Sequence, residues 1–432
     1  MSQFILKSKY FLNSEFELES RCIVCIDGVI KKICPLSYAQ RNFSNLKVID
    51  VSHKIVVPSF VNSHTHVAMG FFRGFGHGKK TLIEKILFPA EKMLSSTLIK
   101  PLSYSYIAAG IKSGVGFFND HYYFSNDVAS AFEKFGVRAA IGETLADLSG
   151  AFPTTDKHFE KTKKDIENWK FSSRIIPVLA PHAADTVSPQ FMQKIAQFAQ
   201  EKNLPIHLHL SQTLGEKQRV FKKHRVSPVA LAYKNNLLGP KTLAVHLITA
   251  DQNDINILKK TRTYFGLCPS SQIIYEHLAP IEKFPLAQTC LGTDAAACND
   301  SGDIMAELNL ASLLFKDRLK KSIDPKKILN MALENPYRYL GLEKSLGKIA
   351  EGYSADFAFF EPDLAAEPLK EQFLENILYS LKSRHVTDLM VEGEFILRNR
   401  KLTKIDESTA ASDYAAAVLE IHKLAGFPKK IA

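Results

Sequence analysis

The spacing of hydrophobic residues between positions 57 and 345 alternates between two periods. Short apolar runs, such as RIIPVLAPH and PIHLHL, have the length and composition of buried strands. Longer runs, such as SPQFMQKIAQFAQEKN, place apolar residues every three or four positions, as amphipathic helices do. This alternation favours βα units around a parallel sheet. The number of units predicts an α/β protein in which residues 57–345 form a closed, TIM-like (β/α)8 barrel.

The two ends of the chain have the pattern of β-strands instead. RCIVCIDGVIKKI contains Asp27-Gly28, a dipeptide typical of tight hairpins, and SADFAFFEP and DLMVEGEFILRNRKL are strand-like runs near the other end. Because these strands flank the barrel region, we expect residues 1–56 and 346–405 to form one small β-sandwich. Residues 406–432 are predicted to form a C-terminal helix or tail.

Histidines and carboxylates occur where the predicted barrel strands end, which is where barrels place their active sites. In VNSHTHVAM, His64 and His66 are two positions apart, so an extended chain directs both imidazoles to the same side. Imidazoles gathered at one point are costly to bury unless something binds them, and a metal ion is the usual partner. The strand-end residues of this kind are His64, His66, Asp120, His121, Glu143, His182, His207, His209, His246 and Asp294.

The following segments occur in chain order: VVPSFVNSHTHVAMGFFRG, FPAEKM, SGVGFFNDHYYF, APHAADTVS, HLHLSQT, LAVHLI, CPSSQ, LGTDAAACND and GKIAEGYSADFAFF. In these segments and their order, the chain resembles the amidohydrolase superfamily, and within it the metal-dependent aminohydrolase branch. The similarity extends to methylthioadenosine/S-adenosylhomocysteine deaminases and to triazine chlorohydrolase-like proteins. It implies a hydrolase acting on C–N bonds other than peptide bonds.

The resemblance also implies one divalent metal, with zinc as the first candidate and iron or manganese as alternatives. The implied ligands are His64, His66, His209 and Asp294. Asp294 would also take a proton from the hydroxide-forming water, and His246 would assist beside it. His207 is expected to be a hydrogen-bonding neighbour of the ligands.

On the substrate side, Glu91 matches a glutamate that binds ribose hydroxyls, and His182 matches a histidine that contacts the purine ring. The implied reaction is hydrolytic deamination of an adenosine-type nucleoside, in which hydroxide held by the metal converts a 5′-modified adenosine to the inosine analogue and ammonia. The expected partner is therefore a small nucleoside or heterocycle.

The chain departs from the family pattern three residues after the third histidine ligand, where Gln212 replaces the usual glutamate. An amide donates a hydrogen bond but does not transfer a proton as a carboxyl group does. Asp120, Glu143 and Glu216 are candidates for the missing role, with Glu143 preferred as a substrate-side residue. Glu143 also stands where relatives that bind homocysteine have an arginine, which disfavours S-adenosylhomocysteine and favours a neutral or basic 5′ group.

Two other functions stay open because of Gln212. The protein could hydrolyse another heterocycle with a leaving group that needs no protonation. Alternatively, it could be a catalytically weakened relative that binds a nucleoside.

Composition and charge argue against a nucleic-acid-binding protein and against a membrane protein. The chain has 432 residues and a formal net charge of +10, but its Lys and Arg are scattered and form no nucleic-acid-binding motif. It has no apolar run of about 18 residues and no recognisable signal sequence, so we expect no membrane association. Six cysteines without paired metal-site spacing favour buried thiols and a reducing cytoplasm. A homo-oligomer is compatible with the sequence but is not specified by it.

Overall fold

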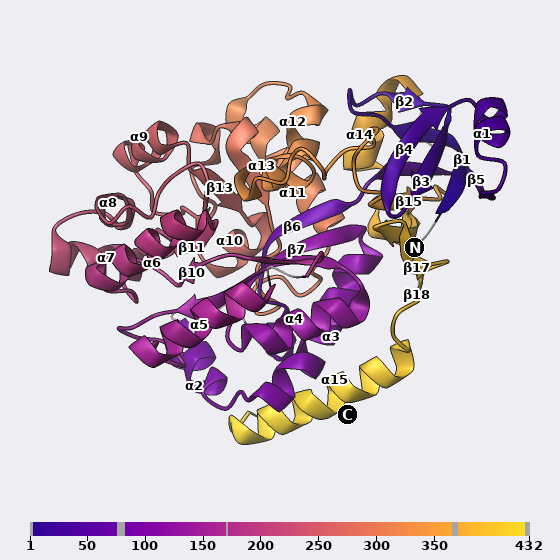
Figure 1. The fold of residues 1–432 in the computed structure, drawn as a ribbon. Coiled ribbons are helices and arrows are strands. Elements are labelled where there is room, and N and C mark those ends of the chain that lie inside the picture. The colour runs from indigo at the N-terminus through magenta and orange to yellow at the C-terminus, as the bar shows by residue number, and fades with distance from the viewer. Residues whose placement is uncertain (1–2, 76–82, 170–171, 365–369, 428–432) are drawn as a thin grey trace.

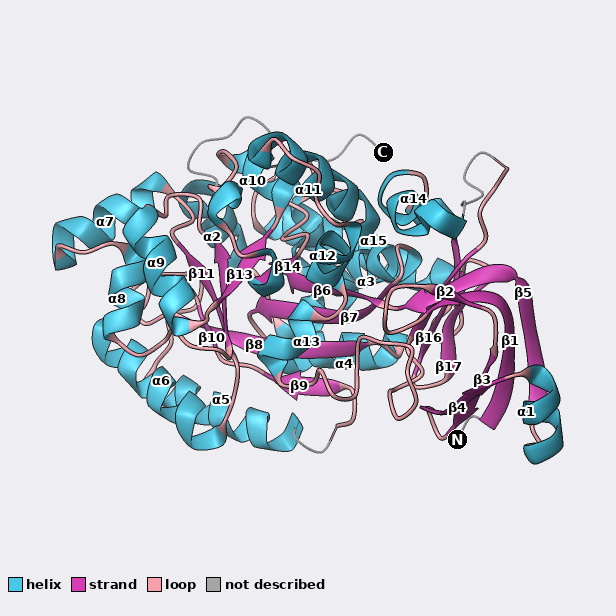
Figure 2. Ribbon diagram, turned by 90° about the horizontal axis from the view of Figure 1, so that it is seen from above, coloured by secondary structure: helices cyan, strands magenta, loops and turns pink. Residues whose placement is uncertain are grey.

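The computed structural model describes residues 3–75, 83–169, 172–364 and 370–427, and its centre is a ring of parallel strands surrounded by helices (Figures 1 and 2). The strands of the ring are β6 (Phe60–Thr65), β7 (Val115–Tyr122), β8 (Arg138–Leu145), β9 (Ile175–Pro177), β10 (Ala180–Pro181), β11 (Ile206–Leu210), β12 (Thr242–His246), β13 (Tyr264–Leu267) and β14 (Thr289–Leu291). One parallel sheet joins β6 to β10, and a second joins β11 to β14. Isolated parallel bridges link Leu179 to Ile206 and Thr65 to Asp294, which connects the two sheets at both edges. The strand pairing therefore agrees with the predicted α/β barrel.

The barrel strands have water on neither face. Every residue of β7 and of β8 is buried, as expected for parallel strands that lie between the barrel interior and a layer of helices. The fourth strand position is split into β9 and β10, and each of these short strands ends in a proline, Pro177 and Pro181. Proline has no N–H to donate to a neighbouring strand, which explains the interruption.

Helices cover the outside of the ring (Figure 2). Several begin at residues that accept hydrogen bonds from the first turn: Ser188 accepts from the N–H of Phe191 at the start of α6, and Asp303 accepts from the N–H groups of Met305 and Ala306 at the start of α11. The helices of this region are α2 (Phe88–Glu91), α3 (Ser96–Lys112), α4 (Ser125–Phe135), α5 (Asp156–Trp169), α6 (Pro189–Lys202), α7 (Leu214–His224), α8 (Pro228–Lys234), α9 (Gln252–Thr261), α10 (Pro269–Tyr275), α11 (Ile304–Leu319), α12 (Pro325–Leu329) and α13 (Asn335–Leu340).

The two ends of the chain meet in a nine-stranded sheet that is separate from the barrel. Its strands are β1 (Gln3–Leu12), β2 (Leu18–Glu19), β3 (Cys22–Ile26), β4 (Val29–Cys34), β5 (Lys47–Pro58), β15 (Phe357–Phe360), β16 (Val386–Val391), β17 (Glu394–Arg398) and β18 (Lys401–Leu402), with α1 (Leu36–Asn42) and α14 (Phe373–Tyr379) attached. Strand β15 pairs with β5, and the core beside them contains Phe4, Val56, Phe357 and Met390. The ends therefore share one core, as predicted. The hydrogen bonds define a single sheet, and the two-layered sandwich with its boundaries at residues 56, 346 and 405 stays a prediction.

The predicted hairpin at Asp27-Gly28 is confirmed. Strands β3 and β4 pair antiparallel on either side of it, with Ile26 opposite Val29. Both turn residues have positive φ, 51° and 79°, which is the geometry that favours this dipeptide.

The C-terminal segment forms helix α15 (Glu407–Leu424), which packs on α3 beneath the barrel (Figure 1). The hydroxyl of Tyr414 donates to the carbonyl of Gly70 at 2.9 Å, and Nε2 of His422 donates to the carbonyl of Phe71 at 2.7 Å. Gly70 and Phe71 belong to the 3₁₀ turn that directly follows His66. Helix α15 thus supports the segment that holds the second histidine of the predicted metal site.

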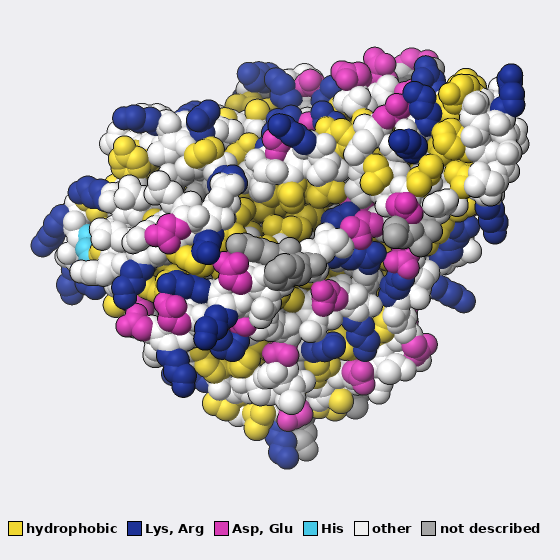
Figure 3. All heavy atoms as spheres, in the orientation of Figure 1, with side chains coloured by type: hydrophobic (Ala, Val, Ile, Leu, Met, Phe, Trp, Pro, Cys, Tyr) yellow, Lys and Arg dark blue, Asp and Glu magenta, His cyan; other side chains and the backbone are white. Residues whose placement is uncertain are grey.

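The structure also bears on the cysteines, on membrane-spanning helices and on the surface charge. All six cysteines are free and buried, and burial raises the pKa of the Cys25 thiol. Within the described ranges, we find no helix with the length and apolarity needed to cross a membrane. On the face drawn in Figure 3, Lys and Arg side chains lie among Asp and Glu side chains.

Closure of the barrel depends on a glycine just before Asp294. The amide of Gly292 donates to the carbonyl of Leu267, and the amides of Thr293 and Asp294 donate to the carbonyl of His64 at 3.1 and 2.9 Å. A Cβ atom on Gly292 would lie 2.7 Å from the backbone nitrogen of His64. Only glycine therefore allows the chain after β14 to approach β6 this closely.

We predict that Gly292→Ala separates these two strands and lowers the free energy of unfolding by about 1–3 kcal/mol, the usual cost of overpacking. Thermal or denaturant unfolding measures this change. Gly239→Ala is the control, because a Cβ atom there would meet nothing within 4 Å. Equal stability of the two variants would contradict this account of barrel closure.

Candidate metal centre and substrate pocket

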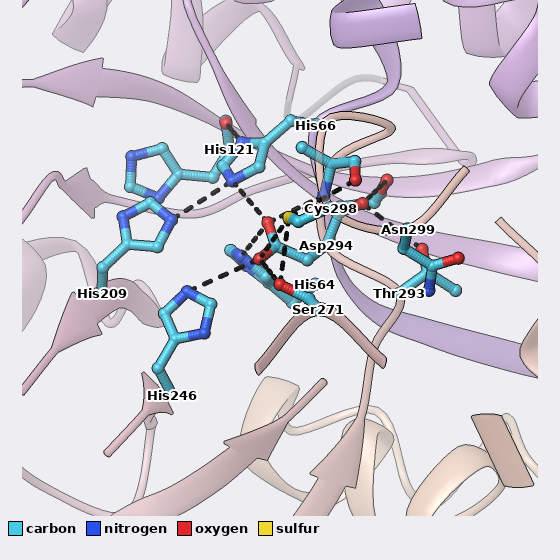
Figure 4. A network of polar contacts seen from close by, with 12 residues as sticks. His64, His66, His121, His209, His246, Ser271, Thr293, Asp294, Cys298 and Asn299 are labelled. Atoms are coloured by element: carbon cyan, nitrogen blue, oxygen red, sulfur yellow. Dashed lines mark hydrogen bonds and ion pairs between the residues drawn. The ribbon is translucent and has the colours of Figure 1, made fainter. Parts of the chain in front are cut away.

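Four imidazoles and one carboxylate meet at the carboxyl ends of the barrel strands (Figure 4). His64 lies in β6 and His66 directly follows it, His209 lies in β11, and His246 ends β12. Asp294 follows β14 on the other side of the barrel closure. Residues separated by up to 230 positions in the sequence therefore become neighbours because the barrel is closed.

The ligating atoms lie within a few ångströms of one another. The Nε2 atoms of His64 and His66 are each 3.4 Å from Oδ1 of Asp294. The Nε2 atoms of His66 and His209 are 3.2 Å apart. His64, His66 and His209 form one group able to hold a metal ion, and His64, His246 and Asp294 form a second group that overlaps it. These residues could hold one metal ion between them.

The opposite nitrogen of each predicted histidine ligand is already engaged. Nδ1 of His66 donates to the carbonyl of His121, and Nδ1 of His209 donates to the carbonyl of His182 at 2.9 Å. Nδ1 of His64 lies 2.7 Å from Nε2 of His207, the contact expected for that residue. With Nδ1 as the donor, each Nε2 presents its lone pair to the centre, which is the arrangement that orients metal-binding histidines.

The charges of these groups suit a divalent cation. Burial and the nearby His64 lower the pKa of His66 to about 3, and burial lowers the pKa of His246 to about 3. Burial acts to raise the pKa of Asp294, but its interaction with His64 and the charges of the surrounding imidazoles hold that pKa well below its usual range. At neutral pH, His66 and His246 are therefore neutral imidazoles and Asp294 is an ionised carboxylate. Zinc, iron and manganese all accept such a set.

The backbone holds Asp294 in an uncommon conformation, with φ of 62°. Its carboxylate is fixed by Ser271, whose hydroxyl donates to Oδ2 at 2.5 Å, and by the amide of Ala295, which donates to Oδ1 at 2.8 Å. His246 also has positive φ, 80°. Strained backbone of this kind persists where the surrounding structure requires it, commonly at functional sites.

A pocket opens over this centre. Its walls include His66, His209 and Asp294, together with the predicted substrate residues Glu91, His182 and Gln212. Tyr122 donates to Oε1 of Glu91 at 2.8 Å, and burial raises the pKa of that carboxyl group to about 7. Nδ1 of His182 lies 2.9 Å from the hydroxyl of Thr186. The structure therefore brings these three residues together beside the metal ligands, while their roles stay predictions.

Glu143 does not reach this pocket, in contrast to the prediction. Its carboxylate accepts hydrogen bonds from the amides of Phe124 and Ser125, at 3.3 and 2.8 Å, and pairs with His158 at 3.3 Å. It thus holds the first turn of α4 and lines a different hollow. Its place at a strand end suggested an inward side chain, but the exposed amides at the start of α4 bind it instead.

The carboxylates of the two other candidates also accept hydrogen bonds from backbone amides. Asp120 accepts from the amide of Val67, and Glu216 accepts from the amides of Ser211 and Gln212. Neither is among the residues that line the pocket. Burial raises the pKa of each to about 8. Glu216 therefore positions the segment that carries Gln212.

Among the pocket and centre residues that received no role from the sequence, His121, Ser271 and Cys298 carry polar or ionisable side chains close to the ligands. His121 was noted as a strand-end residue only, and its ring lines the pocket. Ser271 and Cys298 lie beside Asp294, and the Ser271 hydroxyl is 3.0 Å from the Cys298 sulfur. For His121 the signal was present, because it follows Asp120 at the end of a predicted strand. Ser271 lies on α10, in the matching segment CPSSQ, but the resemblance assigned it no role.

We predict that His207→Leu lowers the affinity for Zn²⁺ about 10- to 100-fold, because it removes the group that orients His64. A competition titration with a chelator of known affinity measures this change. His224→Leu, at the end of α7, is the matched control and should leave the affinity as it is. An unchanged affinity in His207→Leu would contradict the orienting role.

Comparison with solved structures supports the fold. An adenosine deaminase from Xanthomonas campestris with bound zinc superposes with a TM-score of 0.90 at 22% identity, covering 98% of this chain and 99% of that one. At this identity the likeness concerns the fold alone.

Comparison with known sequences identifies the family. A 5-methylthioadenosine/S-adenosylhomocysteine deaminase of Carboxydothermus hydrogenoformans is 33% identical over 372 residues, covering 84% of this chain and 85% of that protein. A 5′-deoxyadenosine deaminase of Methanosphaera stadtmanae is 29% identical and covers 94% and 96%. Residues 55–396 match the amidohydrolase family. The resemblance seen in the sequence is thereby confirmed: the chain belongs to the amidohydrolase family and is a hydrolase that acts on C–N bonds.

Proposed function

We propose that this protein is a metal-dependent hydrolytic deaminase of adenosine-type nucleosides, which it converts to the inosine analogues and ammonia. The observation that carries the proposal is the pocket in which His66, His209 and Asp294 lie beside Glu91 and His182. Relatives of similar length are named for deamination of 5′-modified adenosines, which supports the same substrate class.

His64, His66, His209 and Asp294 are the residues that would hold the metal, and zinc is the cation that we propose. When bound, a divalent cation lowers the pKa of water and so makes hydroxide available at neutral pH. The rest of the reaction depends on protons that the protein must accept and return.

Asp294 is the group suited to accept the proton of the attacking water. Its carboxylate is ionised, and Oδ2 lies 3.9 Å from Nε2 of His246. His246 is a neutral imidazole at the edge of the same centre, so it can donate a hydrogen bond to the oxygen that adds to the ring carbon. The proton held on Asp294 can then pass to the departing amine.

Glu91 and His182 would orient the nucleoside. One carboxylate oxygen of Glu91 receives the hydrogen bond of Tyr122, which leaves the other oxygen as an acceptor for a sugar hydroxyl. The segment 146–154, which follows β8, is where the family resemblance implies arginines in members that bind homocysteine, and here it contains no arginine or lysine. This favours a nucleoside with a neutral or basic 5′ group over one that ends in a carboxylate.

Gln212 favours a second candidate function. Its amide can hydrogen-bond to a ring nitrogen but cannot protonate it, and the substitution for glutamate would matter less for a leaving group that departs unprotonated. Hydrolysis of such a heterocycle is the alternative. A protein that only binds nucleosides is a third possibility, which the complete set of metal-ligating residues disfavours.

The test is release of ammonia from 5′-deoxyadenosine, methylthioadenosine, adenosine, S-adenosylhomocysteine, guanine and cytosine by the zinc-loaded protein and by its Gln212→Glu variant. We predict turnover of the adenosine compounds, and a rise in kcat of about 100-fold in the variant, the usual size of a general-acid contribution. Gln200→Glu adds the same charge on the exposed side of α6 and should change nothing. No ammonia from either protein would refute deamination and favour the other two functions.

A pH dependence follows from Glu91. Its raised pKa of about 7 means that the acceptor carboxylate becomes more abundant as the pH rises, so KM for a ribose-containing substrate should fall as the pH rises through about 7. Glu91→Gln should raise KM roughly 10-fold and abolish this dependence. A 2′,3′-dideoxynucleoside, which lacks the hydroxyls, is the control. If its KM varies with pH in the same way as that of the ribonucleoside, Glu91 does not bind the sugar.

A further inference from the structure

His121 is a buried polar group that the proposed reaction leaves without a role. It lies in β7, its side chain is 1% exposed, and it is one of the residues that line the substrate pocket. Neither ring nitrogen has a hydrogen-bond partner within the described part of the chain. Burial of an imidazole without a partner is unfavourable, so an unpaired one that faces a pocket indicates a ligand contact.

The neighbouring rings do not supply that partner. The His121 ring packs against His209, with ring centroids 4.6 Å apart (Figure 4), and lies 6.1 Å from the ring of His182. Nδ1 of His209 is bonded to the carbonyl of His182, and Nδ1 of His182 lies against Thr186. Both nitrogens of His121 therefore remain available.

His121 is also outside the predicted metal centre. Among the described residues, the groups whose ligating atoms lie within 4.8 Å of one another contain His64, His66, His209, His246 and Asp294, but not His121. Its backbone carbonyl receives the hydrogen bond of His66, so its main chain supports the centre while its ring faces the pocket. A ring in this position meets the substrate close to the reacting atom.

We propose that the His121 side chain hydrogen-bonds to an endocyclic nitrogen of the substrate base and so helps to determine which heterocycle is accepted. This inference rests on the proposed deamination of a nucleoside. A neutral imidazole carries one donor and one acceptor, and the ring nitrogens of a purine are acceptors. His121 and Gln212 would then hold the base through two uncharged groups from different strands, which suits a neutral heterocycle.

The test combines variants of His121 with substrate analogues that each lack one nitrogen. Inhibition constants of 1-deaza-, 3-deaza- and 7-deazaadenosine are measured against the zinc-loaded wild type, His121→Leu and His121→Gln. In the wild type, an analogue that lacks a contacted nitrogen should bind roughly 5- to 10-fold more weakly than adenosine. In His121→Leu one of these penalties should disappear, and the affinity for adenosine should fall by the same factor.

Controls separate a substrate contact from a structural role. His121→Gln keeps a donor and an acceptor, so it should restore part of the lost penalty, and both variants should retain the zinc content of the wild type. The inference is overturned if all penalties persist in His121→Leu, or if that variant loses its zinc. A wild type that neither deaminates adenosine compounds nor binds these analogues overturns the proposed function and this inference together, whereas normal activity with unchanged penalties overturns the inference alone.

Discussion

The convergence of His64, His66 and His209 on Asp294 is the constraint on which the rest of this structure depends. Burying three imidazoles and one carboxylate side by side removes them from water, and this cost must be offset by partners. The protein engages the outer nitrogen of each imidazole, with His207 and two backbone carbonyls. The inner nitrogens are then directed to one point, as a cation requires.

The positions of these ligands depend on parts of the structure outside the centre. Asp294 lies next to His64 because Gly292 permits a close approach between the ends of the barrel sheet. The turn after His66 is held from below by Tyr414 and His422 of α15. Helix α15 and Gly292 therefore both contribute to the geometry of the centre, although neither provides a ligating side chain.

The pocket holds few carboxyl groups that could transfer a proton to a substrate. Gln212 occupies a position where the family resemblance implies a glutamate, and the nearby carboxyl groups of Asp120, Glu143 and Glu216 are bound to backbone amides. The carboxyl groups that do line the pocket are those of Glu91 and Asp294. If the protein deaminates nucleosides, Asp294 carries most of the proton transfer, and the base is held by uncharged side chains.

The sequence predicted the features that depend on local pattern. The two-residue spacing of His64 and His66, the Asp27-Gly28 hairpin and the βα alternation each follow from the geometry of a short segment. What could not be predicted depends on contacts between distant segments. Glu143 ends a barrel strand as expected, yet the free amides of α4 turn it away from the pocket. The unpaired ring of His121 becomes evident only once its neighbours are placed.

X-ray absorption spectroscopy of the purified, zinc-loaded protein, together with metal analysis, tests the central claim most directly. The account predicts one zinc per chain, bound by three imidazole nitrogens and by oxygen. Absence of zinc under metal-replete conditions would contradict it. Sulfur in the coordination shell would also contradict it, because it would move the metal from these residues towards Cys298.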